Sequence, residues 1–73
     1  MTTRMWEAVA ATGKVDQLVA WALQHAPTEA QVYRSADDRV VIIDATGGGP
    51  PDAPTELLSR PPHSWDFEPV LRG

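Results

Sequence analysis

Apolar residues recur along this chain with two different periods, and the two periods predict strands and helices. The run from Val40 to Ile43 places four β-branched side chains in succession inside the segment Arg39–Asp44. Successive side chains of a strand point to opposite faces, so a strand of this composition is buried on both faces. The segments Gln31–Arg34 and Arg39–Asp44 flank Ser35–Asp38, whose small and acidic residues are typical of a tight turn. The pattern therefore predicts a β-hairpin whose second strand is central in a sheet.

A helical period occupies Lys14–Ala26. Its apolar residues follow the i, i+3, i+4, i+7 spacing and form one stripe: Val15, Leu18, Val19, Ala22, Leu23 and Ala26. Asp16 lies in the first turn, where the helix dipole favours negative charge, and Pro27 ends the helix.

The remaining segments are shorter. Arg4–Ala10 alternates as a strand, although its Ala and Glu content leaves a helical alternative open. Thr46–Ala53 is a loop with three glycines and two prolines, and Pro54–Arg60 is expected to form a short second helix. Trp65–Val70 alternates cleanly, but Pro69 lacks a backbone N–H, so this strand belongs at an edge.

The order strand, helix, strand, strand, helix, strand predicts the fold. We expect a single α+β domain over residues 1–73 with the ferredoxin-like βαββαβ arrangement: a four-stranded antiparallel sheet and two helices on one face. Helices on one face leave the other face of Val40–Ile43 uncovered, which favours a homodimer. A chain of 73 residues is marginally stable without such support, and the absence of cysteine excludes disulfides.

Net charge and hydropathy limit the classes of partner and the cellular compartment that we expect for this protein. Ten acidic residues against six dispersed basic residues give a net charge of −4, which argues against nucleic acid. The sequence has no apolar run of the ~20 residues that span a membrane, and it begins without a signal-peptide pattern. We therefore expect a cytoplasmic protein with no membrane partner.

The stretch from Gly13 to Trp21, Gly-Lys-Val-Asp-Gln-Leu-Val-Ala-Trp, follows the first predicted strand. In this stretch and in its order of elements, the chain resembles small dimeric α+β-barrel proteins, the superfamily that contains antibiotic-biosynthesis monooxygenases. The resemblance implies two ferredoxin-like subunits whose sheets stack face to face. It also implies cofactor-independent oxygenation of an electron-rich aromatic substrate. Haem-binding members rely on an asparagine, and this sequence contains none.

Five residues combine a ring or a charge with a place on a predicted element, and they form the predicted ligand site: Tyr33, Arg34, His63, Trp65 and His25. His63 is the candidate general base, because histidine titrates near neutrality. Three of them also have a structural interpretation: Arg34 as the ion-pair partner of an Asp or Glu on a neighbouring strand, His25 as boundary packing at a helix end, and His63 as a strand-entry residue bonded to backbone. The three tryptophans are compatible with core, interface or ligand contacts.

Three functions stay open at this point. The first is a small dimeric protein, non-catalytic or accessory, that binds a small aromatic or acidic molecule. The second is a monooxygenase-like enzyme, as the resemblance implies, and the third is a protein–protein adaptor that uses the loop 47–54. Whether the chain is an enzyme is left undecided. We predict no cofactor and no metal site, because two isolated histidines lack the spacing of metal ligands.

Overall fold

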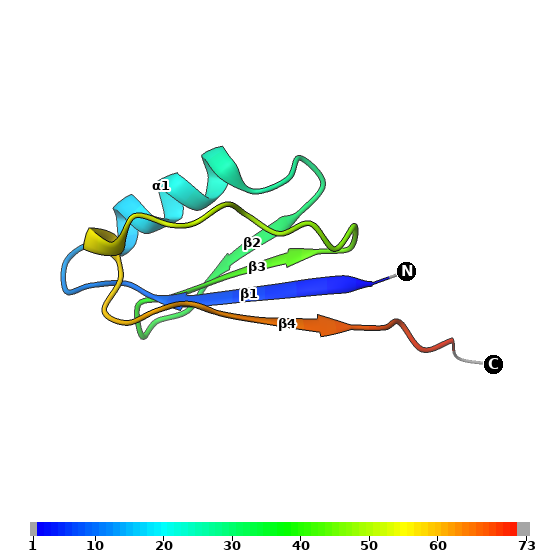
Figure 1. Ribbon diagram of the computed structural model, residues 1–73. Helices are drawn as coiled ribbons and strands as arrows, with labels where there is room; N and C mark the ends of the chain where they lie inside the picture. Colours follow the sequence, from blue (N-terminus) through cyan, green and yellow to red (C-terminus); the bar gives the residue numbers. More distant parts are fainter. Residues whose placement is uncertain (1, 72–73) are drawn as a thin grey trace.

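Four antiparallel strands form one sheet, and a single α-helix crosses one of its faces, in the computed structural model, which describes residues 2–71 (Figure 1). The elements follow in the order β1 (Thr3–Val9), α1 (Val15–His25), β2 (Gln31–Arg34), β3 (Arg39–Asp44), a 3₁₀ turn η1 (Thr55–Leu57) and β4 (His63–Phe67). The class of the fold is therefore α+β, as the pattern of apolar residues predicts.

The strands lie in the order β2-β3-β1-β4, and every neighbouring pair is antiparallel. The predicted hairpin is confirmed, since β2 and β3 have the expected bounds and pair from Gln31↔Ile43 to Arg34↔Val40. The predicted central position of β3 and the edge position of the last strand are confirmed as well.

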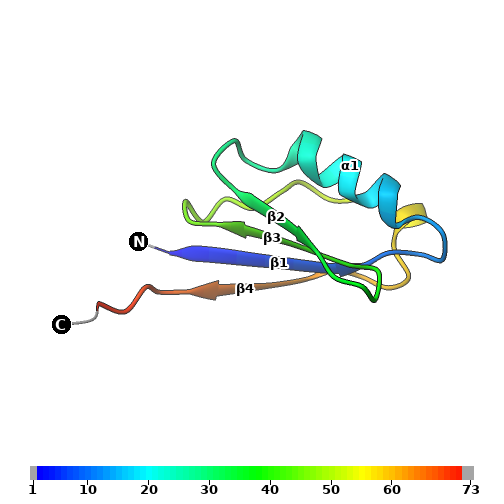
Figure 2. The ribbon, with the colours of Figure 1, turned by 180° about the vertical axis from the view of Figure 1, so that it is seen from behind.

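The core lies between the sheet and α1. Its buried residues come from the face of the sheet that points to the helix, from the helix itself and from η1: Trp6, Ala8, Ala10, Leu18, Ala22, Val40, Ile42 and Leu57. We call this side of the sheet the helix face. The opposite side, which no described helix covers, is the open face (Figures 1 and 2).

Helix α1 buries a narrower stripe than its sequence predicts. Leu18 and Ala22 are fully buried, and Val15, Val19 and Ala26 pack around them, but Leu23 is 68% exposed. Leu23 lies at the flank of the stripe, and the sheet has only four strands, so the helix covers it without enclosing its own flank. The predicted inclusion of Leu23 in the core is wrong.

The expected second helix over Pro54–Arg60 is reduced to the single 3₁₀ turn η1. Leu58, directly after this turn, already has extended backbone angles, φ −112° and ψ 139°. Hydrogen bonds to β1 hold it there, because Ser59 N–H donates to the carbonyl of Val9 and Ala11 N–H donates to that of Leu57, at 3.0 and 2.8 Å. Pairing with β1 therefore replaces helical hydrogen bonds in this segment.

Strand β4 begins and ends earlier than the predicted Trp65–Val70. It starts at His63, directly after Pro61 and Pro62, and stops at Phe67, two residues before Pro69. A proline lacks the N–H that a ladder needs, so the prolines delimit a strand of five residues. Beyond β4 the chain runs past the end of the sheet, so this segment does not cover the open face (Figure 1). No helix among residues 2–71 has the length and apolar character to cross a membrane.

Replacement of Leu18 by alanine is expected to destabilise the fold by about 2–5 kcal/mol, because it empties a fully buried site. Leu23→Ala, on the same helix, is the matched control and is expected to change stability by less than about 0.5 kcal/mol. Chemical denaturation of both variants measures the difference. Equal losses would show that Leu23 is packed as tightly as Leu18.

Candidate functional site

Two regions of the surface have the character of a site, and the first is the open face. Its side chains come from all four strands by the alternation of the sheet: Thr3, Met5, Glu7, Val9, Gln31, Tyr33, Arg39, Val41, Ile43, His63, Trp65 and Phe67. With His63 left aside, seven of these twelve are apolar or aromatic. Tyr33, Trp65 and Phe67 are exposed by 50, 43 and 50%. Four strands thus present a broad apolar surface to solvent.

One ion pair interrupts this apolar surface near its middle. Arg39 Nη1 lies 3.1 Å from Glu7 Oε2, and the Glu7 side chain is only 14% exposed. Arg39 Nη2 is also 3.7 Å from Asp37 Oδ2 in the β2–β3 turn. The open face therefore carries both charges in a paired form and has no isolated cation among the residues described.

The predicted site residues do not converge. Tyr33, His63 and Trp65 lie on the open face, but Tyr33 is on edge strand β2 and the histidine is on edge strand β4. Three strand spacings of ~4.8 Å put the two edges about 14 Å apart. Within this group, only His63 and Trp65 are in contact: their rings stack with centroids 5.8 Å apart.

The other two predicted residues lie elsewhere and are already engaged. Arg34 forms an ion pair with Asp16 of α1, at 3.0 Å. His25 stacks on Trp21, with centroids 5.2 Å apart, and its Nδ1 donates a hydrogen bond to the Trp21 carbonyl at 3.0 Å. For His25, boundary packing at a helix end describes what is found. Arg34 forms an ion pair as its structural interpretation expects, but the partner lies on α1 and not on a neighbouring strand.

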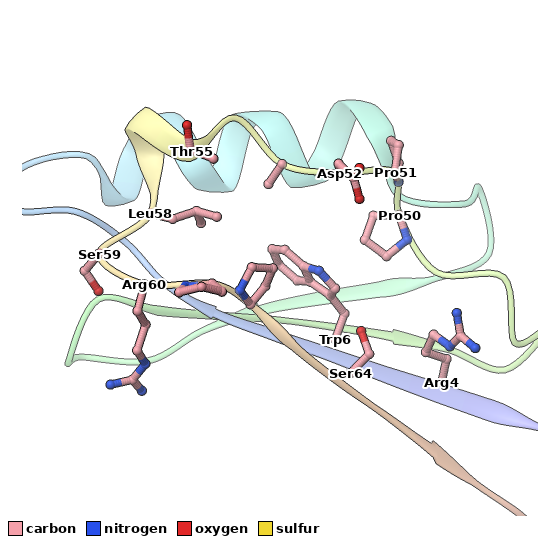
Figure 3. A pocket seen from close by; sticks show the side chains of 13 residues that line it. Arg4, Trp6, Pro50, Pro51, Asp52, Thr55, Leu58, Ser59, Arg60 and Ser64 are labelled. Carbon is pink, nitrogen blue, oxygen red and sulfur yellow. The ribbon is translucent and has the colours of Figure 1, made fainter.

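The second region is a pocket on the helix face, beside α1, where the expected second helix would have packed (Figure 3). Its volume is about 610 Å³, within the ~300–1,000 Å³ of small-molecule sites. Its lining comes from β1, from the segment 50–62 and from β4: Arg4, Trp6, Pro50, Pro51, Asp52, Ala53, Thr55, Leu58, Ser59, Arg60, Pro61, Pro62 and Ser64. The Trp6 ring lies at the base, between the loop and the sheet (Figure 3).

The buried carboxylate of Asp44 fixes the loop that forms one wall of this pocket. It accepts hydrogen bonds from Thr46 N–H at 2.9 Å, from the Thr46 hydroxyl at 2.6 Å and from Gly49 N–H at 2.8 Å. These bonds lower the pKa of Asp44 from 3.8 to about 2, with the Thr46 hydroxyl as the largest cause. The loop is thereby folded back over the end of β3.

Glycine is required where this loop passes over β1. Gly49 has a positive φ of 70°, and a Cβ there would lie 3.0 Å from Arg4 Cδ. Any larger residue would be strained by this φ, and the Arg4 side chain would have to shift to admit it. Gly49 thus allows the loop to approach β1 closely.

Arg4 closes one end of the pocket, and its charge is compensated. Its Nε donates to Asp66 Oδ1 at 2.9 Å and its Nη2 to Asp66 Oδ2 at 3.4 Å. This contact raises the pKa of Arg4 and lowers that of Asp66, and Asp44 raises the pKa of Arg4 further. Two carboxylates therefore surround one guanidinium.

Sequence reasoning did not identify this pocket. Its lining is spread over residues 4 to 64 and meets only because β1 pairs with β4 and the loop folds over both. One local signal was available: Asp44-Ala45-Thr46 before glycines is typical of an Asx turn, which would have predicted an ordered loop.

Comparisons of this chain with protein-family models, with curated proteins and with solved structures give no match. The class of the protein therefore follows from its fold alone: a small α+β protein with a four-stranded antiparallel sheet and, among the described residues, one α-helix. The resemblance to the dimeric α+β-barrel superfamily stays a prediction. Within residues 2–71, no group of three or more histidine, aspartate or glutamate side chains is arranged to hold a metal ion.

The lowered pKa of Asp44 predicts a loss of stability in acid. A folded-state pKa below the ordinary 3.8 contributes stability that is complete above that value and is lost as the pH falls through about 2. Asp44→Asn keeps the shape but presents an amide N–H₂ to the donors of the loop. We expect the variant to be less stable than the natural chain at pH 7, with a gap that narrows between pH 3.8 and 2.

Urea denaturation of both proteins at several pH values measures this gap. Asp37 and Asp66 also have lowered pKa values, through Ser35 and Arg4, so the natural chain loses stability from several groups. The difference between the two proteins isolates Asp44. A gap that is independent of pH would show that the charge of Asp44 does not hold the loop.

Proposed function

We propose that this protein is a non-catalytic homodimeric binding module with a reduced ferredoxin-like architecture, in which the second helix has shrunk to η1. The strand order β2-β3-β1-β4 and the uniformly antiparallel pairing support this architecture. The observation that carries the proposal is the open face, which leaves the apolar side chains of two central strands without cover.

The composition of the open face supports a second copy of this chain as the cover. Val41 and Ile43 of central strand β3 and Met5 of β1 are only half-buried. A two-fold axis through the middle of the face places the same apolar surface on both sides, as a self-complementary interface requires. It also brings the internally neutralised Glu7–Arg39 pair of each subunit near that of the other, which avoids a like-charge contact.

The size of the face indicates a reversible dimer. Four strands at ~4.8 Å and about seven residues at ~3.4 Å give faces that together bury on the order of 1,000 Å². Specific interfaces bury roughly 1,200–2,000 Å² in total. The dimer is therefore expected to dissociate on dilution.

The ligand of such a dimer is a small aromatic molecule held between the paired faces. The stacked rings of His63 and Trp65 offer an aromatic contact, and Tyr33 adds a phenol at the other edge. An aromatic ligand is favoured over an acidic one because Arg39, the cation of this face, is already paired with Glu7. The non-catalytic interpretation is favoured because His63 contacts the ring of Trp65 and, among residues 2–71, no side chain hydrogen-bonds to it to orient it as a base.

Light scattering over a concentration series is expected to give twice the chain mass of 8.0 kDa at high concentration, with dissociation on dilution. Val41→Lys places a charge inside the interface and is expected to weaken the dimer about 100-fold or more. The control is Ala20→Lys on the exposed side of α1, which adds the same charge and leaves the open face intact. A monomer at every concentration, or equal effects of the two variants, would contradict the proposal.

Titration with phenol tests the aromatic site separately. His63→Ala removes one ring of the stack and is expected to weaken phenol binding several-fold, since an aromatic pair contributes about 0.5–1.5 kcal/mol. Arg34→Ala is expected to leave binding unchanged, because Arg34 is paired with Asp16 away from the open face. Phenol binding that depends on Arg34 instead would place the ligand on the other side of the sheet.

A further inference from the structure

The pocket on the helix face is separate from the open face and has its own chemistry. Prolines line it at two places, Pro50–Pro51 in the loop and Pro61–Pro62 before β4, and Leu58 and Trp6 complete its apolar surface. Proline side chains lose little conformational entropy on contact with a ligand, because their rings are already rigid. The walls are thus suited to a compact apolar body such as a phenyl ring.

Among the groups that line the pocket, Asp52 is the carboxylate, and its charge has no partner. No ion pair or hydrogen bond joins its side chain to another residue in the described range 2–71. In Figure 3 this side chain hangs from the loop on the pocket side, above the level of Trp6. A ligand cation at this position would meet a carboxylate that is not already neutralised.

The cations of the lining do not offset Asp52. The guanidinium of Arg4 is bonded to Asp66 and lies in the field of Asp44, so two carboxylates already balance it. The guanidinium of Arg60 points away from the pocket (Figure 3). The pocket therefore holds one carboxylate, that of Asp52, which neither cation of the lining neutralises.

Trp6 adds a second attraction for a positive charge. Its ring is 5% exposed, lines the pocket and contacts the ring of Trp21 on α1, with centroids 5.7 Å apart. An electron-rich indole attracts an organic cation through its quadrupole, most strongly where water is excluded. Indole and carboxylate together favour an ammonium group attached to an apolar body.

We propose that this pocket binds a small organic cation, a primary amine with an aromatic or aliphatic body, with its ammonium group at Asp52 and its apolar part among Trp6, Leu58 and the prolines. This site lies across the sheet from the proposed subunit interface, and it does not depend on dimerisation. A monomeric protein that binds amines would refute the proposed function and leave this inference standing.

The test uses three probes that share a phenyl group and differ in charge: phenethylamine, phenethyl alcohol and phenylacetate. Each is titrated into the ¹⁵N-labelled full chain, and the indole N–H signal of Trp6 and the amides of Asp52 and Ala53 are followed. The amine is expected to bind about tenfold more tightly than the alcohol, and phenylacetate more weakly than either.

Two variants separate the site from the overall charge of the protein. Asp52→Asn is expected to reduce phenethylamine affinity about tenfold, to that of the alcohol. Asp38→Asn in the β2–β3 turn makes the same change in net charge away from the pocket, and asparagine tolerates the positive φ of 65° at that position. Its affinity for the amine is expected to equal that of the natural chain.

The outcomes that overturn the proposal are specific. Phenylacetate binding as tightly as the amine would assign the pocket to anions through Arg4. Equal losses in the two variants would reduce the effect to bulk charge. Absence of saturable shifts at Trp6 with all three probes would show that the pocket is not a ligand site.

Discussion

The buried carboxylate of Asp44 is the interaction on which the arrangement of this molecule most depends. It terminates the central strand β3 and at the same time gathers the donors of Thr46 and Gly49. A buried charge is tolerated only when hydrogen bonds replace its lost water, and here a backbone loop provides them. The loop is consequently directed back across the sheet, and the segment that follows it is brought over Trp6.

The two faces of the sheet differ because the described chain has one α-helix, which covers one face only. Helix α1 buries Val40 and Ile42 on one side, and the alternate residues Val41 and Ile43 face the other side half-covered. On the helix face itself, η1 is too short to fill the space beside α1, and the pocket occupies that space. The open face and the pocket thus have the same cause, because one helix and one 3₁₀ turn are too little to cover both faces of the sheet.

The parts of the fold that were predictable from sequence are those fixed by local patterning. The hairpin and its bounds follow from β-branched runs around a turn, and α1 follows from a helical stripe that ends before Pro27. The prediction of a second helix over Pro54–Arg60 is wrong because hydrogen bonds from Ser59 and Ala11 hold Leu58 extended after η1 and join this segment to the β1 region, some fifty residues away. No local propensity reports such a contact.

The candidate site was less predictable for the same reason. The sequence correctly assigns Tyr33 and Trp65 to strands and places His63 only at a strand entry, but which residues meet depends on strand order, and β2 and β4 lie at opposite edges. In the sequence, Arg34 and His25 are candidates for ligand binding. In the structure, Arg34 is paired with Asp16, and His25 is hydrogen-bonded to the carbonyl of Trp21. Asp52 lines the pocket but lies in a loop, and the predicted site contains only residues placed on a predicted helix or strand.

The short strand β4 also bears on edge-to-edge association between copies of this protein. An edge strand presents unpaired N–H and C=O groups that can recruit the edge of another molecule, and long exposed edges seed fibrils. Pro61 and Pro62 before β4 and Pro69 after it limit that edge to five residues and interrupt its ladder at both ends. The aromatic side chains of Trp65 and Phe67 are thus displayed on a strand whose backbone offers only a short edge to another molecule.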